Sequence, residues 1–196
     1  MKWRAATALA MMMCAQAAVL PPTAGAQDNP TETVRVQYET FSAAYQAGDL
    51  AGAELAARSA LDAHAAADLD DASRAVLLVN LAIVLVESRQ GVAAQGALDQ
   101  LSGLPPESYA EAAALAAVLR AGADYWADPT TGQALVAALE AAPTGQTMLS
   151  RQALTLAQTL AEQAQTARDV PLAGRAWAKT ARFSEAGGAQ APLILG

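Results

Sequence analysis

The chain has 196 residues, with 12 Lys and Arg against 19 Asp and Glu, which gives a formal net charge of −7. Proteins that bind nucleic acid or anionic lipid electrostatically carry clustered Lys and Arg, so this composition argues against both classes of ligand. Cys14 is the only cysteine, which excludes a disulfide bond within the chain.

Residues 1–26 have the pattern of a secretory signal peptide. Basic Lys2 and Arg4 precede an apolar run over residues 5–20, and the small residues 24–26 follow. This order predicts cleavage after Ala26 and a periplasmic or secreted location. Because the apolar run is shorter than the about 20 residues that cross a bilayer, we expect no transmembrane segment in the mature chain.

Residues 27–186 are expected to form one all-α domain, because Ala and Leu fill most positions and no segment alternates like a β-strand. Glycine, proline and capping residues predict helices at about 31–47, 50–66, 71–89, 92–101, 108–126, 131–142, 144 or 147 to 167, and 169 to 187. Ser108 and Glu111 have the spacing of a capping box at the start of the fifth helix.

A small residue recurs at intervals of about 40 residues, near the close-packed point of every second predicted helix. The positions are Ala53, Ala94, Ala134 and Ala176. Such a period is typical of stacked helical hairpins, in which small side chains allow two backbones to approach closely. The sequence therefore predicts an α-solenoid of about four antiparallel helical hairpins, although an up-and-down bundle would contain the same helices.

The segment from Tyr38 to Ala65 resembles a tetratricopeptide repeat. Its Gly48-Asp49-Leu50 resembles the turn of that family, and Ala53, Ala60 and Leu61 match later positions of the motif. A second, weaker unit is formed by Asn80-Leu81-Ala82, Leu85, Ala94, Leu98 and Leu101. The resemblance is degenerate, because the interval exceeds the family's usual period of about 34 residues.

This resemblance implies a concave groove, lined by the first helix of each pair, that binds a peptide or a helix of another protein. It thus implies an exported adaptor or scaffold for a protein partner. The residues that map to the groove are Tyr38, Ser42, Tyr45, Asn80, Ile83, Glu87 and Arg120.

The third predicted helix is apolar around its whole circumference. Between Ala75 and Val86, Asn80 is the only polar residue. An unpaired amide buried there would cost about 1–3 kcal/mol, so Asn80 must bridge two helices or meet a ligand. We expect the structural role, with neighbouring helices and the chain's own tail burying this helix; the alternative is that one of its faces is left for a partner.

No reaction is indicated by the sequence. His64 is the only histidine, and it lies on the apolar stripe of its helix, where a partly packed residue at a helix end is expected. The neighbouring Asp62, Asp68, Asp70 and Asp71 lack the spacing of a calcium loop. We therefore expect a protein that is not an enzyme and has no catalytic residues, metal or cofactor.

An alternative function remains for the same helices. A closed bundle could serve as a structural subunit or bind a small apolar ligand, and it would enclose a cavity beside the third helix. The apolar tail, residues 187–196 with the run Ala191–Gly196, is compatible with capping the solenoid or with lying in the groove of another molecule.

Overall fold

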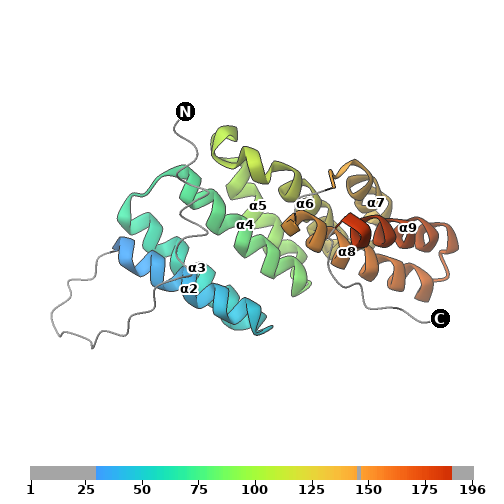
Figure 1. The fold of residues 1–196 in the computed structure, drawn as a ribbon, viewed down its shortest axis with the longest axis horizontal. Coiled ribbons are helices and arrows are strands. Elements are labelled where there is room, and N and C mark those ends of the chain that lie inside the picture. Colours follow the sequence, from blue (N-terminus) through green and yellow to red (C-terminus); the bar gives the residue numbers. More distant parts are fainter. Residues whose placement is uncertain (1–29, 145–146, 187–196) are drawn as a thin grey trace.

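A computed structural model describes residues 30–144 and 147–186 of the chain (Figure 1). The described residues form eight α-helices and two short 3-10 helices, and none of them is in a β-strand. The predicted all-α fold class is confirmed. The predicted signal peptide and the C-terminal tail lie outside the described residues.

The elements are α2 (Pro30–Gln46), α3 (Leu50–Ala67), α4 (Asp71–Glu87), α5 (Gly91–Ser102), η1 (Pro106–Ala112), α6 (Ala113–Ala127), η2 (Pro129–Thr131), α7 (Gly132–Ala141), α8 (Thr147–Thr166) and α9 (Val170–Ala186).

Aspartate side chains cap the start of several helices. Asp49 accepts a hydrogen bond from the Gly52 N–H at 2.9 Å, and Asp70 accepts one from the Ser73 N–H at 2.7 Å. Each carboxylate thereby pairs a backbone donor that the first helical turn leaves free. Gly48, before α3, has a φ of 77°, which a residue without a Cβ adopts at little cost.

The predicted start of the fifth helix is wrong. Residues Pro106–Ala112 form the 3-10 helix η1, and α6 begins only at Ala113. Pro105 and Pro106 hold the chain in a tight turn, in which the Ser108 N–H donates to the Pro105 carbonyl at 2.9 Å. Tyr109 then departs from helical geometry, with φ −133° and ψ 21°. Ser108 therefore does not cap an α-helix.

The helices pack in consecutive pairs: α2 with α3, α4 with α5, α6 with α7, and α8 with α9 (Figure 1). Successive pairs contact one another through α3 and α4, α5 and α6, and α7 and α8. The first helices of later pairs also meet, because α6 contacts both α4 and α8.

The predicted small-residue positions hold in three of the four pairs. Ala53, Ala94 and Ala176 are fully buried, whereas Ala134 is exposed. In α7 the close approach occurs instead at Gly132, where a Cβ would lie 3.1 Å from Leu172 Cδ2. The prediction for Ala134 is therefore wrong, because the glycine two residues earlier takes the contact.

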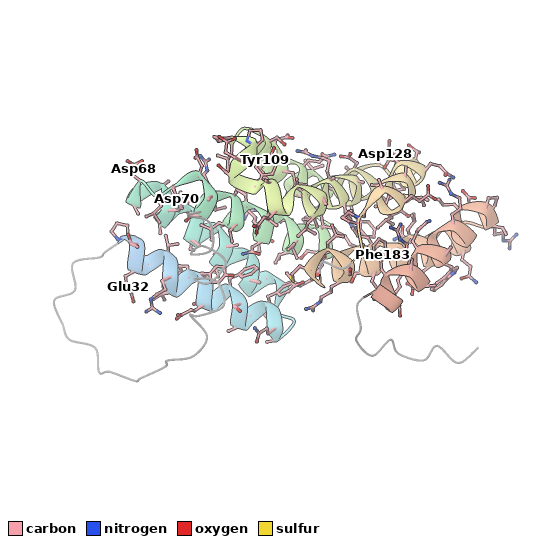
Figure 2. The ribbon with its side chains drawn as sticks, turned by 45° about the horizontal axis from the view of Figure 1, so that its top comes forward. Glu32, Asp68, Asp70, Tyr109, Asp128 and Phe183 are labelled. Atoms are coloured by element: carbon pink, nitrogen blue, oxygen red, sulfur yellow. The ribbon has the colours of Figure 1, made fainter. Side chains whose placement is uncertain are left out.

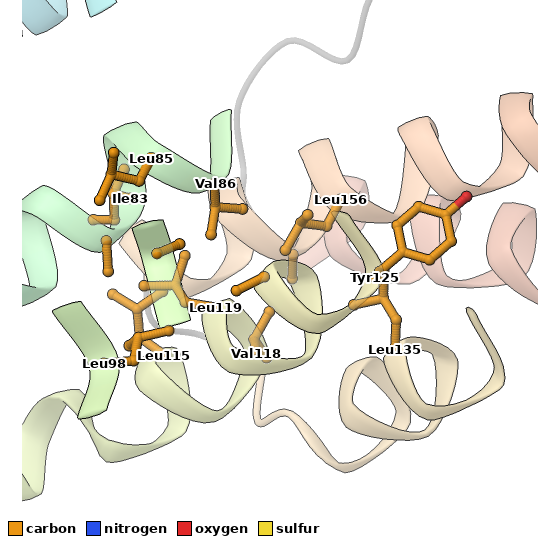
Figure 3. Packing of buried hydrophobic residues seen from close by; sticks show 14 of the residues in the cluster. Ile83, Leu85, Val86, Leu98, Leu115, Val118, Leu119, Tyr125, Leu135 and Leu156 are labelled. Carbon is orange, nitrogen blue, oxygen red and sulfur yellow. The ribbon is translucent and has the colours of Figure 1, made fainter. Parts of the chain in front are cut away.

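Helix α4 lies at the centre of the hydrophobic core. Its residues from Ala75 to Val86 are buried, with the exceptions of Val76 and Asn80. Figure 3 shows Leu85 and Val86 among core side chains of α5, α6 and α8. Neighbouring helices therefore cover this apolar helix except at Val76 and Asn80, and the part expected of the tail lies outside the described residues. Across the part of the chain that the structure describes, no helix is both long and apolar enough to cross a membrane.

Candidate functional site

Three side chains from distant parts of the chain meet where α2 and α4 end. The Tyr45 hydroxyl of α2 donates to Glu87 Oε1 of α4 at 2.7 Å. Gln152 Nε2 of α8 donates to the same Glu87 oxygen at 2.8 Å and to the Tyr45 hydroxyl at 3.0 Å. We call these three residues the closed end, because α8 covers the surface of α2 and α4 at this point.

The environment of Tyr45 keeps its hydroxyl protonated. The Tyr45 ring stacks on Phe41 with centroids 5.8 Å apart, and the Arg151 guanidinium lies 5.4 Å from its centroid. Burial, together with the hydrogen bond to the Glu87 carboxylate, raises the pKa of Tyr45 to about 12. Tyr45 therefore remains a neutral donor to Glu87 at physiological pH.

Gln152 was not among the predicted site residues. It is fully buried, and its Oε1 has no hydrogen-bond partner among the described residues, although both amide hydrogens have acceptors. The sequence does hold a signal, because Gln152 interrupts the apolar stripe formed by Leu149, Leu156 and Leu160 in α8. A buried glutamine in such a stripe needs a polar partner, but its sequence position does not reveal which one.

Further from the closed end, α2 and α4 each carry partly exposed side chains on the helix face that holds Tyr45 or Glu87. Tyr38 lies two helical turns before Tyr45 on α2, and Asn80 lies two turns before Glu87 on α4, which places each pair on one face of its helix. Tyr38, Ser42 and Asn80 are half-buried, and Val76 is 50% exposed. We call these four residues the open end.

Asn80 does not have its expected structural role. Within the described residues its side-chain amide makes no hydrogen bond to another helix, and it remains in contact with solvent. The Tyr38 hydroxyl is likewise without a hydrogen-bond partner there. Ser42, by contrast, accepts a hydrogen bond from Gln46 Nε2 at 3.2 Å within α2. The expectation that Asn80 bridges two helices is therefore wrong.

Two of the predicted groove residues lie elsewhere. Ile83 is only 1% exposed and belongs to the hydrophobic core (Figure 3). Arg120 of α6 donates to Asp99 Oδ1 at 2.6 Å and to the Gln95 carbonyl at 3.3 Å, both on α5. Of the predicted groove residues, the structure thus joins Tyr45 and Glu87 directly, whereas Arg120 is paired with α5. Whether they bind a partner stays a prediction.

A second feature is a cavity of about 430 Å³ at the turn between α3 and α4, where Asp68 and Asp70 lie (Figure 2). Its lining consists of Leu61, Asp62, His64, Ala65, Asp68, Leu69, Asp71, Arg74 and Gln100. The predicted packing of His64 at a helix end is confirmed: the ring is buried, and its Nε2 lies 3.1 Å from the Asp70 carbonyl oxygen. The Ser73 N–H, as the main cause, lowers the pKa of the Asp70 carboxyl.

The composition of this cavity limits what it could hold. Charged and polar side chains form much of the wall, which does not suit the small apolar ligand of the alternative function. In the described ranges, no group of three or more His, Cys, Asp or Glu side chains has the arrangement of a metal site.

Comparison of the chain with protein-family models, curated proteins and solved structures found no match.

Proposed function

We propose that the protein is an exported, tetratricopeptide-repeat-like adaptor that binds an extended, apolar segment of another protein on the open end of α2 and α4. The observation that carries this proposal is the unpaired amide of Asn80 beside exposed Val76, on a core helix that is otherwise covered. The paired packing of the helices supports the solenoid on which the adaptor function depends. The leader pattern of residues 1–26 supports export.

The open end has the groups that recognise an extended backbone. An asparagine amide donates and accepts at once, so Asn80 can pair with both the N–H and the C=O of a peptide. Tyr38 adds a hydroxyl and an aromatic surface, and Val76 adds an apolar contact. A segment with alternating apolar side chains and free backbone groups matches this set.

The closed end prepares this surface for binding. Its hydrogen bonds tie α2, α4 and α8 together at one point, so the open end is held in place before a ligand arrives. A surface that is ordered in advance loses less conformational entropy on binding than one that must be ordered by the ligand.

Photocrosslinking in the producing cell tests the proposal. A photoreactive phenylalanine replaces Tyr38 at the open end, and a matched variant carries it at Leu55, an exposed position on α3. We expect adducts with a defined protein from position 38 and none of these from position 55. Identical adducts from the two positions would contradict the proposal.

A titration with a synthetic peptide of the crosslinked segment then tests the role of Asn80. Loss of one or two hydrogen bonds costs about 0.5–1.5 kcal/mol each, so Asn80→Ala should weaken binding about tenfold. Leu55→Ala serves as the control and should bind like the unchanged protein. Equal affinity of both variants would exclude the open end as the binding surface.

A further inference from the structure

We infer that the chain's own C-terminal segment, Ala191–Gly196, occupies the open end and competes with the partner there. This inference builds on the proposed function, because it names an intramolecular ligand for the same surface. Three features support it: the place where α9 ends, the length of the chain beyond it, and the chemistry of the segment.

The end of α9 lies near the closed end. Helices α8 and α9 are antiparallel about a tight turn, in which the Asp169 N–H donates to the Ala164 carbonyl at 2.8 Å. The last turn of α9 is therefore level with the first turns of α8, as Figure 1 shows at the centre of the molecule. Those first turns of α8 carry Arg151 and Gln152, which contact Tyr45.

The chain beyond α9 is long enough to reach the open end. Residues 187–196 span up to about 33–36 Å when extended. Along the helices, Tyr38 lies about 10 Å from Tyr45, and Val76 lies about 16 Å from Glu87.

The segment has the chemistry that the open end requires. Leu193, Ile194 and Leu195 are large and apolar, and Ala191–Gly196 carries no charged side chain. Pro192 favours an extended backbone for itself and for the residue before it, which leaves backbone groups free for Asn80. A tethered segment acts at an effective concentration in the millimolar range, so weak intrinsic affinity is sufficient for occupancy.

A cysteine pair tests the position of the tail. In a Cys14→Ser background of the full chain, Val76→Cys is combined with Ile194→Cys, and the control combines Val92→Cys with Ile194→Cys. Val92, on α5, is 74% exposed against 50% for Val76, so accessibility alone favours the control. We expect the intramolecular disulfide of the Val76 pair to form at least about tenfold faster, because bonding needs the two residues held close together. Equal rates, or disulfide-linked dimers as the main product, would overturn the inference.

A full-chain variant with Leu193→Asp, Ile194→Asp and Leu195→Asp tests the competition, using a labelled synthetic peptide of residues 187–196 as the probe. Removal of the tethered competitor should tighten peptide binding at least about tenfold, and Asn80→Ala in the same variant should weaken it again. Unchanged affinity would overturn the inference. Crosslinks from position 38 to a partner, together with equal disulfide rates, would leave the adaptor function standing without the competing tail. Fast formation of the Val76 disulfide without any partner adduct from position 38 would support the docked tail and contradict the adaptor function.

Discussion

The closed and open ends of the α2 and α4 face present similar residues in different states. The closed end has Tyr45 on α2 and Glu87 on α4, and the open end has Tyr38 on α2 and Asn80 on α4. On each helix the two residues are separated by two helical turns. At the closed end, Gln152 from α8 completes a hydrogen-bonded cluster. At the open end, Asn80 and the Tyr38 hydroxyl have no partner in the described part of the chain. The difference therefore lies in α8, whose Gln152 gives hydrogen bonds to the closed end and none to the open end.

Truncation of Gln152 should have the largest effect among changes to the residues of the closed and open ends. Gln152→Ala removes two hydrogen bonds and leaves a cavity beside the Glu87 carboxylate, so we expect a loss of about 2–4 kcal/mol in the free energy of unfolding. Urea denaturation measures this change. Gln158→Ala, at a half-buried position of the same helix, is the control and should stay within about 0.5 kcal/mol. Similar losses for both variants would show that the closed end is not a stabilising cluster.

Gly122 allows α4, α6 and α8 to approach one another near the closed end. A Cβ there would lie 3.0 Å from both Cδ atoms of Leu156 and 3.3 Å from Val86 Cγ1. Leu156 is itself buried and cannot move aside freely. Gly122→Ala should therefore lower the free energy of unfolding by about 1–2 kcal/mol, after allowance for the higher helix propensity of alanine. Gly96, in α5, has no atom within 4 Å of a Cβ, so Gly96→Ala should raise stability by up to about 1 kcal/mol. Stabilisation by both substitutions would show that α8 is not tightly packed on α6.

The sequence predicts the helices well and the cluster only in part. Glycine turns and aspartate caps fix where α3 and α4 begin, because these signals act over a few residues. The resemblance to a tetratricopeptide repeat assigns Tyr45 and Glu87 to one predicted surface. Gln152 could not be assigned to them, since its partners lie 107 and 65 residues away and only tertiary packing joins them. For the same reason, the burial of Ile83 in the core was not predictable from its position on α4.

Removal of the Tyr45 hydroxyl tests the electrostatics of the closed end. Tyr45→Phe should lower the free energy of unfolding by about 1–2 kcal/mol at neutral pH, because a hydrogen bond to a carboxylate is lost. Folding raises the pKa of Tyr45 from its ordinary value of 10.0 to about 12, so the folded state favours the protonated hydroxyl. The stabilising contribution is therefore complete below pH 10 and declines as the pH rises from 10 towards 12.

Urea denaturation of Tyr45→Phe and the unchanged protein at pH 8, 10 and 11 measures this dependence. The difference between the two should shrink above pH 10. Tyr109→Phe is the control, since the Tyr109 hydroxyl makes no hydrogen bond within the described residues. A difference that stays constant up to pH 11 would show that the Tyr45 hydroxyl is not held by Glu87.

Asn80 should give the smallest change in stability. Since its amide has no partner to lose within the described residues, Asn80→Ala should alter the free energy of unfolding by no more than about 0.5 kcal/mol. Leu81→Ala, at the adjacent buried position, is the comparison and should cost about 2–4 kcal/mol. A large loss for Asn80→Ala would mean that the amide supports the fold. A negligible loss, combined with the expected tenfold loss of peptide affinity, would separate the binding role of the open end from the structural role of the closed end.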